Sequence, residues 1–229
     1  MRTVKGSYEV GDIVYVDFGQ KADGVHTQGG VRPTLVIIRS GNNYTVIPIT
    51  SKMHKKLPTH LPFVCKKGSQ IGIKGLMLCE NTTTVDISRI LYYKGSFKAE
   101  EPNYWNGTIN LVGVQLSKKF DEFAKPSEAK FQRGNLLRDA KGRTCLVVSN
   151  EKSNAYGSNV TVVFAQYADR GRLHSLDVMP VNTDKGKTLT CSPLLWNIPK
   201  QNLGDIVEVT GRGTATRVAE HILHRIKQK

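Results

Sequence analysis

One sequence pattern occurs twice in this chain, and the second occurrence is shorter than the first. Gly11 begins the first copy and Gly134 the second, and the apolar run 35–37 (LVI) corresponds to the run 146–148 (LVV). Each copy is about a hundred residues long, which is too long for a solenoid unit and long enough for a domain with its own core. We therefore predict two tandem domains, residues 1–125 and residues 126–229.

The second copy keeps the strand-like segments of the first but loses two features. Arg32 corresponds to Arg143, but the stretch from the opening glycine to this arginine is 21 positions in the first copy and 9 in the second. The alignment also sets Thr50 against Gln166, so a hydroxyl is replaced by an amide. These differences indicate a first copy that carries chemistry and a degenerate second copy.

The charge of the chain favours a polyanionic partner. Its 229 residues include 33 Lys and Arg against 19 Asp and Glu, a formal net charge of +14, and the pI is about 9.7. Nucleic acid fits that charge, and so does an acidic protein. No apolar run approaches the ~18 residues of a membrane helix, and the first residues, MRTVKGSYEVGD, lack the apolar core of a signal peptide. We expect a cytoplasmic protein.

The cysteines do not form a metal-binding pattern. None of the four belongs to a CxxC motif, and no histidine lies at a metal-ligand spacing from one. Three lie in apolar, strand-like runs, and we expect them to be reduced core residues. They are Cys79, Cys145 and Cys191, and Cys79 aligns with Cys191 between the copies. We expect neither a metal nor another cofactor.

Short β-rich runs with close spacing predict a mainly β fold with minor α structure. In the first copy, strands are expected at residues 13–18, 34–38, 44–49, 61–65, 76–78 and from 92 onward. A Gly-Asn-Asn turn at 41–43 joins two of them, a helical turn is expected at 86–89, and residues 19–31 form a long glycine-rich loop. This spacing is typical of a small β-barrel.

Each copy should end in a helix. In the first, a helical face is expected within residues 108–124, followed by a linker at 125–130; the residues of that face are Leu111, Val114, Leu116 and Phe120. In the second, residues 215–229 form an amphipathic helix. Its apolar stripe, which we expect to pack on its own barrel, consists of Val218, Ala219, Ile222, Leu223 and Ile226.

Candidate catalytic residues are few. The chain has no GxSxG motif, no P-loop and no carboxylate pair. Arg32 ends the long loop, and Pro33 holds it extended, while Thr50 ends the facing strand. A mechanism with two histidines, His26 with His54 or His60, stays open as an alternative.

The first copy resembles the MazF/PemK family of toxin endoribonucleases along nearly its whole length. The segments that carry the resemblance are GDIVYVDFG, GGVRPTLVI, the strand ending PITSK, and CENTTTVDISRI. In the last of these, Glu80, Asn81, Thr84 and Asp86 are in register with the family pattern, whereas Thr83 stands where the family often has Arg, and Asn81 replaces a common Gln. The second copy matches only as a fold.

The resemblance implies an SH3-like barrel that cleaves single-stranded RNA without a metal, with Arg32 and Thr50 as catalytic residues. A toxin-type, sequence-specific endoribonuclease of this kind works through attack of the RNA 2′-OH and leaves a 2′,3′-cyclic phosphate and a 5′-OH. The sites that we expect to contact RNA lie in two loops and in the segment after the 76–78 strand. They are Lys21, His26, Gln28, Ser51, Lys52, Lys55, Glu80, Asn81 and Thr84.

The resemblance also implies partners. The family works as a homodimer that binds RNA and a small acidic antitoxin, and two barrels in one chain predict a monomeric pseudo-dimer in which the second copy replaces a subunit. Two alternatives remain: a non-catalytic MazF/CcdB-fold toxin or regulator that binds nucleic acid or gyrase, and a module that binds only a protein partner.

Overall fold

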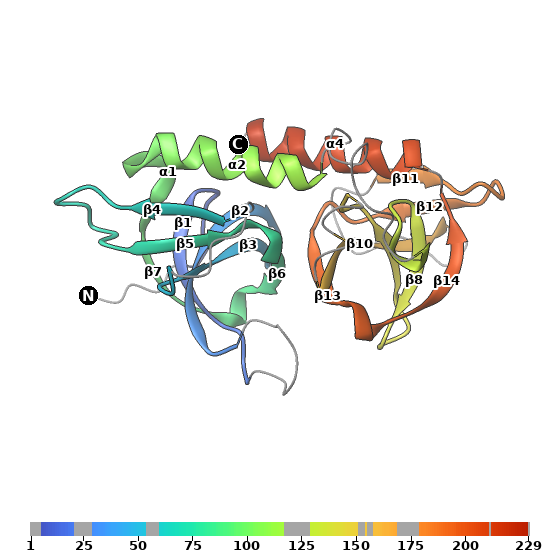
Figure 1. Ribbon diagram of the computed structural model, residues 1–229, viewed down its shortest axis with the longest axis horizontal. Coiled ribbons are helices and arrows are strands. Elements are labelled where there is room, and N and C mark those ends of the chain that lie inside the picture. Colours follow the sequence, from blue (N-terminus) through green and yellow to red (C-terminus); the bar gives the residue numbers. More distant parts are fainter. Residues whose placement is uncertain are drawn as a thin grey trace. The chain divides into compact units, whose positions relative to one another are not determined.

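The computed structural model describes residues 6–20, 29–53, 60–116, 129–150, 154, 158–168, 179–210 and 212–228. These form two compact units, residues 1–112 and 113–228, each with its own antiparallel sheet. In both units the strands curl into a small barrel, as Figure 1 shows. The predicted class, mainly β with two tandem SH3-like barrels, is confirmed.

The first barrel has seven strands in the order β4-β5-β3-β2-β1-β7, with β6 paired to β3. The strand bounds are β1 Asp12–Asp17, β2 Val31–Ser40, β3 Asn43–Thr50, β4 His60–Val64, β5 Lys74–Leu78, β6 Thr83–Asp86 and β7 Ile90–Ser96. Each strand predicted in the first copy is found, within a few residues of the expected bounds. The barrel interior is filled mainly by Val14, Val16, Val36, Tyr44, Val46, Val85 and Ile90.

Short helical turns join the later strands. One is η1, Cys79–Asn81, and the other is η2, Ile87–Arg89. The predicted turn at 86–89 is therefore confirmed. It forms because the Asp86 carboxylate accepts a hydrogen bond of 2.9 Å from the Ser88 amide, which caps the turn. The Ser88 side chain, followed by the Ser88 amide, lowers the pKa of Asp86 through hydrogen bonds.

The helix after the first barrel begins earlier than predicted. Helix α1 spans Phe97–Glu100, and α2 spans Pro102–Leu116. Proline suits the first position of a helix because its missing N–H has no partner there anyway. Of the predicted helical face, Leu111 is half-buried, and residues 117–128, which include Phe120, lie outside the described part. Within residues 102–113 of α2, the buried residues are Trp105, Thr108, Ile109 and Val112.

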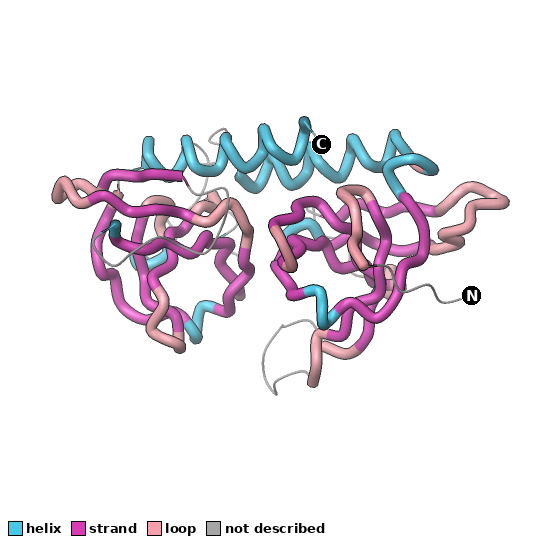
Figure 2. The backbone as a smooth tube through the Cα atoms, turned by 180° about the vertical axis from the view of Figure 1, so that it is seen from behind, coloured by secondary structure: helices cyan, strands magenta, loops and turns pink. Residues whose placement is uncertain are grey.

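The second barrel repeats the strand order of the first. Its order is β11-β12-β10-β9-β8-β14, with β13 paired to β10, so each strand corresponds to one strand of the first barrel. Figure 2 shows strands in the same curled arrangement in both units. The bounds are β8 Asn135–Asp139, β9 Thr144–Val147, β10 Asn159–Tyr167, β11 Met179–Asn182, β12 Thr188–Cys191, β13 Trp196–Pro199 and β14 Leu203–Val209. Short turns η4, Ala129–Phe131, and η6, Lys200–Asn202, complete it.

The opening glycines of the two copies have the same conformation. Gly11 has φ of 98° and Gly134 has φ of 95°, a region that favours glycine. The Gly11 amide donates to the Val36 carbonyl at 2.8 Å, and the Gly134 amide donates to the Val147 carbonyl at 3.1 Å. The predicted match of these glycines is confirmed in geometry.

The predicted match of the cysteines is wrong by two residues. In the ladders, Met77 lies opposite Ile49, and Cys191 lies opposite Ala165, which corresponds to Ile49. Cys191 therefore corresponds to Met77, not to Cys79. A shift of two residues keeps a side chain on the same face of a strand, so the hydrophobic pattern does not reveal it.

The cysteines of the described chain are all free thiols, and three are buried. Burial is the largest cause that raises the pKa of Cys145 and of Cys191 to about 12. Burial also raises the pKa of Cys79. No helix among the described residues is both long and apolar enough to cross a membrane.

Helix α4 spans Arg212–Gln228 and contacts β11. Its predicted stripe is confirmed: Leu223 is half-buried and the other members are buried, namely Val218, Ala219, Ile222 and Ile226.

Candidate active site

Arg32 and Thr50 lie on neighbouring strands of the first barrel. The ladder of β2 and β3 pairs Thr34 with Pro48 and Leu35 with Ile47. The same register, continued by two residues, sets Arg32 directly across from Thr50. Cross-strand neighbours have Cβ atoms ~4.5–5.5 Å apart and share one face of the sheet. The two predicted catalytic side chains therefore lie together at one end of the barrel.

A break in the ladder makes this pairing possible. Near the turn, Ile38 pairs with Thr45, but after the irregularity between Val36 and Ile38 the pairing moves by one residue, so Val36 pairs with Val46. Without this bulge, Arg32 would lie opposite Ser51 instead of Thr50. Bulges of this kind re-aim side chains at the rims of barrels.

Arg32 is held in place but keeps most of its hydrogen-bond donors. The side chain is half-buried, and its Nε donates to the Gly29 carbonyl at 2.9 Å. Its neighbour on β1 is Val16, an apolar residue. Among the described residues, neither Nη group has a partner, so the guanidinium presents a cationic pair of donors for an anion.

Thr50 is oriented by the backbone that follows it. Its Oγ1 accepts a hydrogen bond from the Lys52 amide at 3.2 Å, which leaves the hydroxyl proton to donate elsewhere. Ser51 and Lys52 are both exposed. On the other side, Gly75 of β5 lies so close to the Thr50 carbonyl that a Cβ there would overlap it. The site is therefore bordered by exposed polar groups and closely packed backbone.

Glu80 and Asn81 form a second polar group with a histidine. His60 Nε2 and Glu80 Oε1 lie 2.8 Å apart, and the Asn81 amide donates to the same oxygen at 3.2 Å. The His60 side chain is 7% exposed. The carboxylate fixes the imidazole, an arrangement that the sequence did not reveal because the two residues are twenty positions apart. Of the histidine alternative, His26 and His54 lie outside the described residues.

Thr84 is buried, on the face of β6 opposite to Val85. It is 4% exposed, and its hydroxyl shares a hydrogen bond of 2.9 Å with the hydroxyl of Thr45. In this position it contributes to packing and has little surface to offer a ligand. The remaining predicted RNA contacts, Lys21, His26, Gln28 and Lys55, lie outside the described residues.

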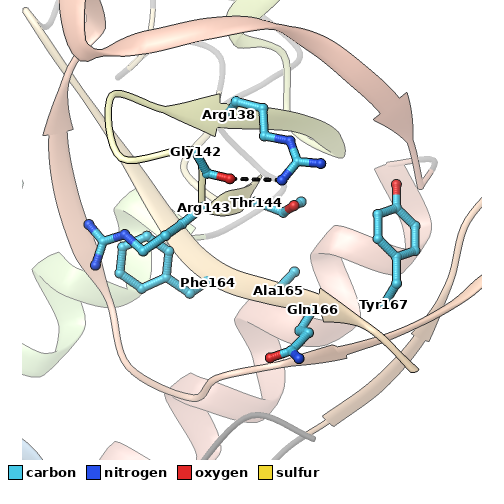
Figure 3. A pocket seen from close by; sticks show the side chains of 8 residues that line it. All are labelled: Arg138, Gly142, Arg143, Thr144, Phe164, Ala165, Gln166 and Tyr167. Atoms are coloured by element: carbon cyan, nitrogen blue, oxygen red, sulfur yellow. Dashed lines mark hydrogen bonds between the residues drawn. The ribbon is translucent and has the colours of Figure 1, made fainter. Parts of the chain in front are cut away.

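The second barrel holds its matching arginine in a different way. The β9–β10 ladder pairs Thr144 with Ala165, so one further step sets Arg143 across from Gln166, as the alignment of the copies predicts. Arg143 Nε donates to the Asp139 carboxylate at 2.7 Å, and Nη2 lies 2.7 Å from the same oxygen. The guanidinium also lies 3.9 Å above the Phe164 ring (Figure 3).

Asp139 is the decisive difference between the two arginines. It occupies the position of Val16 of the first barrel, beside the arginine, and its side chain is buried. Its other oxygen accepts from the amides of Lys141 and Arg143 at 3.0 and 2.8 Å. The Asp139 carboxylate neutralises the Arg143 guanidinium, and the amides of the short turn hold the carboxylate in place. The sequence carried a signal for this, since an aspartate four residues before an arginine in a tight turn favours such a pair.

No group of three or more His, Cys, Asp or Glu side chains that could hold a metal ion occurs within the described ranges.

The first half of the chain matches a known family. Residues 9–110 match the family model described as "PemK-like, MazF-like toxin of type II toxin-antitoxin system". No curated protein sequence matches the chain.

Solved structures that are similar to this chain each cover just under half of it. A mycobacterial endoribonuclease in complex with its cognate antitoxin is 15% identical and covers 47% of this chain and 93% of its own, with a TM-score of 0.36. A MazE–MazF structure from Deinococcus radiodurans is 21% identical and covers 47% of this chain and 96% of its own, with a TM-score of 0.34.

Proposed function

From the premise that residues 9–110 are a PemK-like, MazF-like toxin domain, we propose that the chain is a sequence-specific endoribonuclease of toxin type. It cleaves single-stranded RNA, including mRNA, without a metal. The 2′-oxygen attacks the adjacent phosphorus, the bond to the 5′-oxygen breaks, and the products carry a 2′,3′-cyclic phosphate and a 5′-OH. The 2′-OH loses its proton and the departing 5′-oxygen gains one.

The observation that carries the proposal is the opposed pair Arg32 and Thr50. The transition state of this reaction gathers negative charge on the non-bridging phosphate oxygens. The two Nη groups of Arg32 supply cationic donors for those oxygens, and the Thr50 hydroxyl supplies one more. A threonine hydroxyl is too weak a base to accept the 2′ proton, so its part is donation.

The family description and the charge of the chain support a protein partner. A toxin of a type II toxin-antitoxin system is paired with an antitoxin, and a net charge of +14 suits both an acidic antitoxin and RNA. We propose a small acidic antitoxin that binds this chain in the cytoplasm. The second copy is proposed to replace the second subunit of a dimer, so that the chain works as a monomer.

The test is cleavage of long single-stranded RNA in excess EDTA, with cut sites and end groups mapped. Arg32→Ala and Thr50→Val should each lower the rate at saturating RNA about 10²–10³-fold, the usual loss for one preorganised donor. The matched control is Arg39→Ala on the same strand. Arg39 forms an exposed ion pair with Glu9 at 2.8 Å, so its loss should leave the rate unchanged.

Products with a 5′-phosphate, or complete loss of activity on chelation, would contradict the mechanism. Binding of RNA without any cleavage by the wild-type chain would instead favour the non-catalytic alternative.

A further inference from the structure

The second barrel contains a pocket that the proposed reaction does not use. It has a volume of about 360 Å³, at the small end of the range for ligand sites. Thr144 and Ala165 are a cross-strand pair in the lining; Arg138 lies beside Thr144 on β8, and Tyr167 lies two residues after Ala165 on β10 (Figure 3). The pocket thus combines small residues with a cation and an aromatic ring.

Tyr167 is a rigid wall because a buried carboxylate holds its hydroxyl. Tyr167 Oη donates to Glu208 at 2.7 Å, and the Thr183 hydroxyl donates to the other carboxylate oxygen at 2.6 Å. Lys187 lies 3.6 Å from Glu208 and 5.4 Å from the centre of the Tyr167 ring. Glu208 is 5% exposed, and the hydroxyl of Thr183, followed by that of Tyr167, lowers its pKa. The ring is therefore fixed without a ligand.

Arg138 is the uncompensated cation of the pocket. It is half-buried, and its Nη1 donates to the Gly142 carbonyl at 2.7 Å, which fixes the direction of the side chain. Its other donors have no partner among the described residues. The two neighbouring cations are already paired, Arg143 with Asp139 and Lys187 with Glu208. The pocket thus carries about one net positive charge, which matches a single phosphodiester.

We propose that this pocket binds one nucleotide of a single-stranded RNA and does not cleave it. The base lies against Tyr167, and a phosphate lies on Arg138. Unstacked RNA bases bind aromatic rings in this way, and arginine provides planar donors to phosphate. The choice of RNA as ligand rests on the proposed function.

The pocket cannot stabilise a cleavage transition state as the first barrel would. Asp139 already neutralises Arg143, and Gln166 stands in place of the threonine hydroxyl. What remains is suited to holding a strand. The second copy thereby becomes a non-catalytic RNA-binding domain.

The experiment uses the full chain with Arg32→Ala, so that cleavage is about 10²–10³-fold slower during the measurement. A short fluorescein-labelled oligoribonucleotide is titrated and its anisotropy followed. Adding Tyr167→Leu or Arg138→Gln should weaken binding about tenfold each, the usual scale for one stacked base or one charged hydrogen bond. Tyr167→Phe keeps the ring and should retain the affinity.

Arg217→Gln is the matched control for lost charge, because Arg217 is exposed on α4 and bonds only Thr214 among the described residues. The slope of log K against log salt should decrease by about 0.7 for Arg138→Gln, the value for one phosphate contact on a single strand, and stay unchanged for Arg217→Gln. Photo-crosslinking with RNA that contains 4-thiouridine should label the peptide that carries Tyr167.

Three results would overturn the proposal. The first is that Arg138→Gln and Tyr167→Leu bind RNA as tightly as the Arg217→Gln control. The others are that uridine monophosphate binds as tightly as the oligonucleotide, or that polyglutamate displaces RNA from the pocket. The two proposals can fail separately. If the wild-type chain crosslinks to RNA through Tyr167 but never cleaves it, the proposed endoribonuclease activity is refuted and the proposed binding pocket is not. If the wild-type chain cleaves RNA but gives no crosslink at Tyr167, the proposed binding pocket is refuted and the proposed activity is not.

Discussion

Gly75→Ala should disable the candidate active site without touching either catalytic side chain. Gly75 lies on β5 beside the end of β3, and a Cβ at this position would lie 3.2 Å from the Thr50 carbonyl carbon and 3.3 Å from Ile49 Cγ2. It would also overlap the Thr50 carbonyl oxygen. Ordinary contact between carbon atoms is ~3.5–4.0 Å, so the two strands must separate by about 1 Å where Thr50 is placed.

The size of the effect follows from that displacement. A misplacement of about 1 Å at a reacting centre costs about 10² in rate, and overpacking of this kind costs about 1–3 kcal/mol of stability. We therefore expect cleavage at saturating RNA to fall about a hundredfold while the protein stays folded. Single-turnover cleavage and urea denaturation measure the two quantities.

Gly107→Ala is the matched control. Gly107 lies inside α2, and a Cβ there would lie 3.5 Å from Leu61 Cδ2, an ordinary contact. Alanine also favours a helix interior over glycine by about 1 kcal/mol. This variant should be as stable as the wild type or more stable, with normal cleavage. If Gly75→Ala cleaves RNA as fast as Gly107→Ala, the packing of β5 does not position Thr50.

Three further outcomes are expected. Asp139→Ala should lower the free energy of unfolding by about 2–4 kcal/mol, measured by urea denaturation, because it removes hydrogen bonds and the ion pair to Arg143; a loss below that of an exposed ion pair would contradict the role given to Asp139. Because the folded state lowers the pKa of Glu208, its contribution to stability is complete above the ordinary glutamate value of about 4.3 and is lost as pH falls through the folded pKa. Thermal melts should therefore show wild type more stable than Glu208→Gln near neutral pH, with the gap closing in acid; a gap that does not change with pH would refute this. In native protein, iodoacetamide should alkylate the partly exposed Cys65, while the three buried cysteines should react only after unfolding, as peptide mass spectrometry would show.

Much of the fold could be predicted because strands leave a strong local signal. Alternating apolar residues and glycine-containing turns located six of the seven strands of the first barrel, but not β6, Thr83–Asp86. The repeat placed Arg143 and Gln166 at the positions that correspond to Arg32 and Thr50. The start of α2 was missed because Pro102 and the polar residues after it resemble a loop, whereas the buried face of the helix depends on its packing against the barrel.

The site could be predicted only in part, because its geometry depends on small departures from regular structure. The bulge between Val36 and Ile38 decides whether Arg32 faces Thr50 or Ser51, and no residue type in that run signals it. The pair of His60 and Glu80 depends on strands β4 and β5 lying side by side, which sequence spacing does not show. Local patterns therefore identified the residues, and long-range pairing decided which of them meet.

The presence of both barrels in one chain changes what mutation can do. In a homodimer a single gene encodes both subunits, so every substitution appears twice and an improvement for one site is imposed on its copy. Here Asp139 and Gln166 alter one barrel and leave Val16 and Thr50 of the other untouched. The two halves can therefore diverge independently, which a symmetric assembly of identical subunits cannot do.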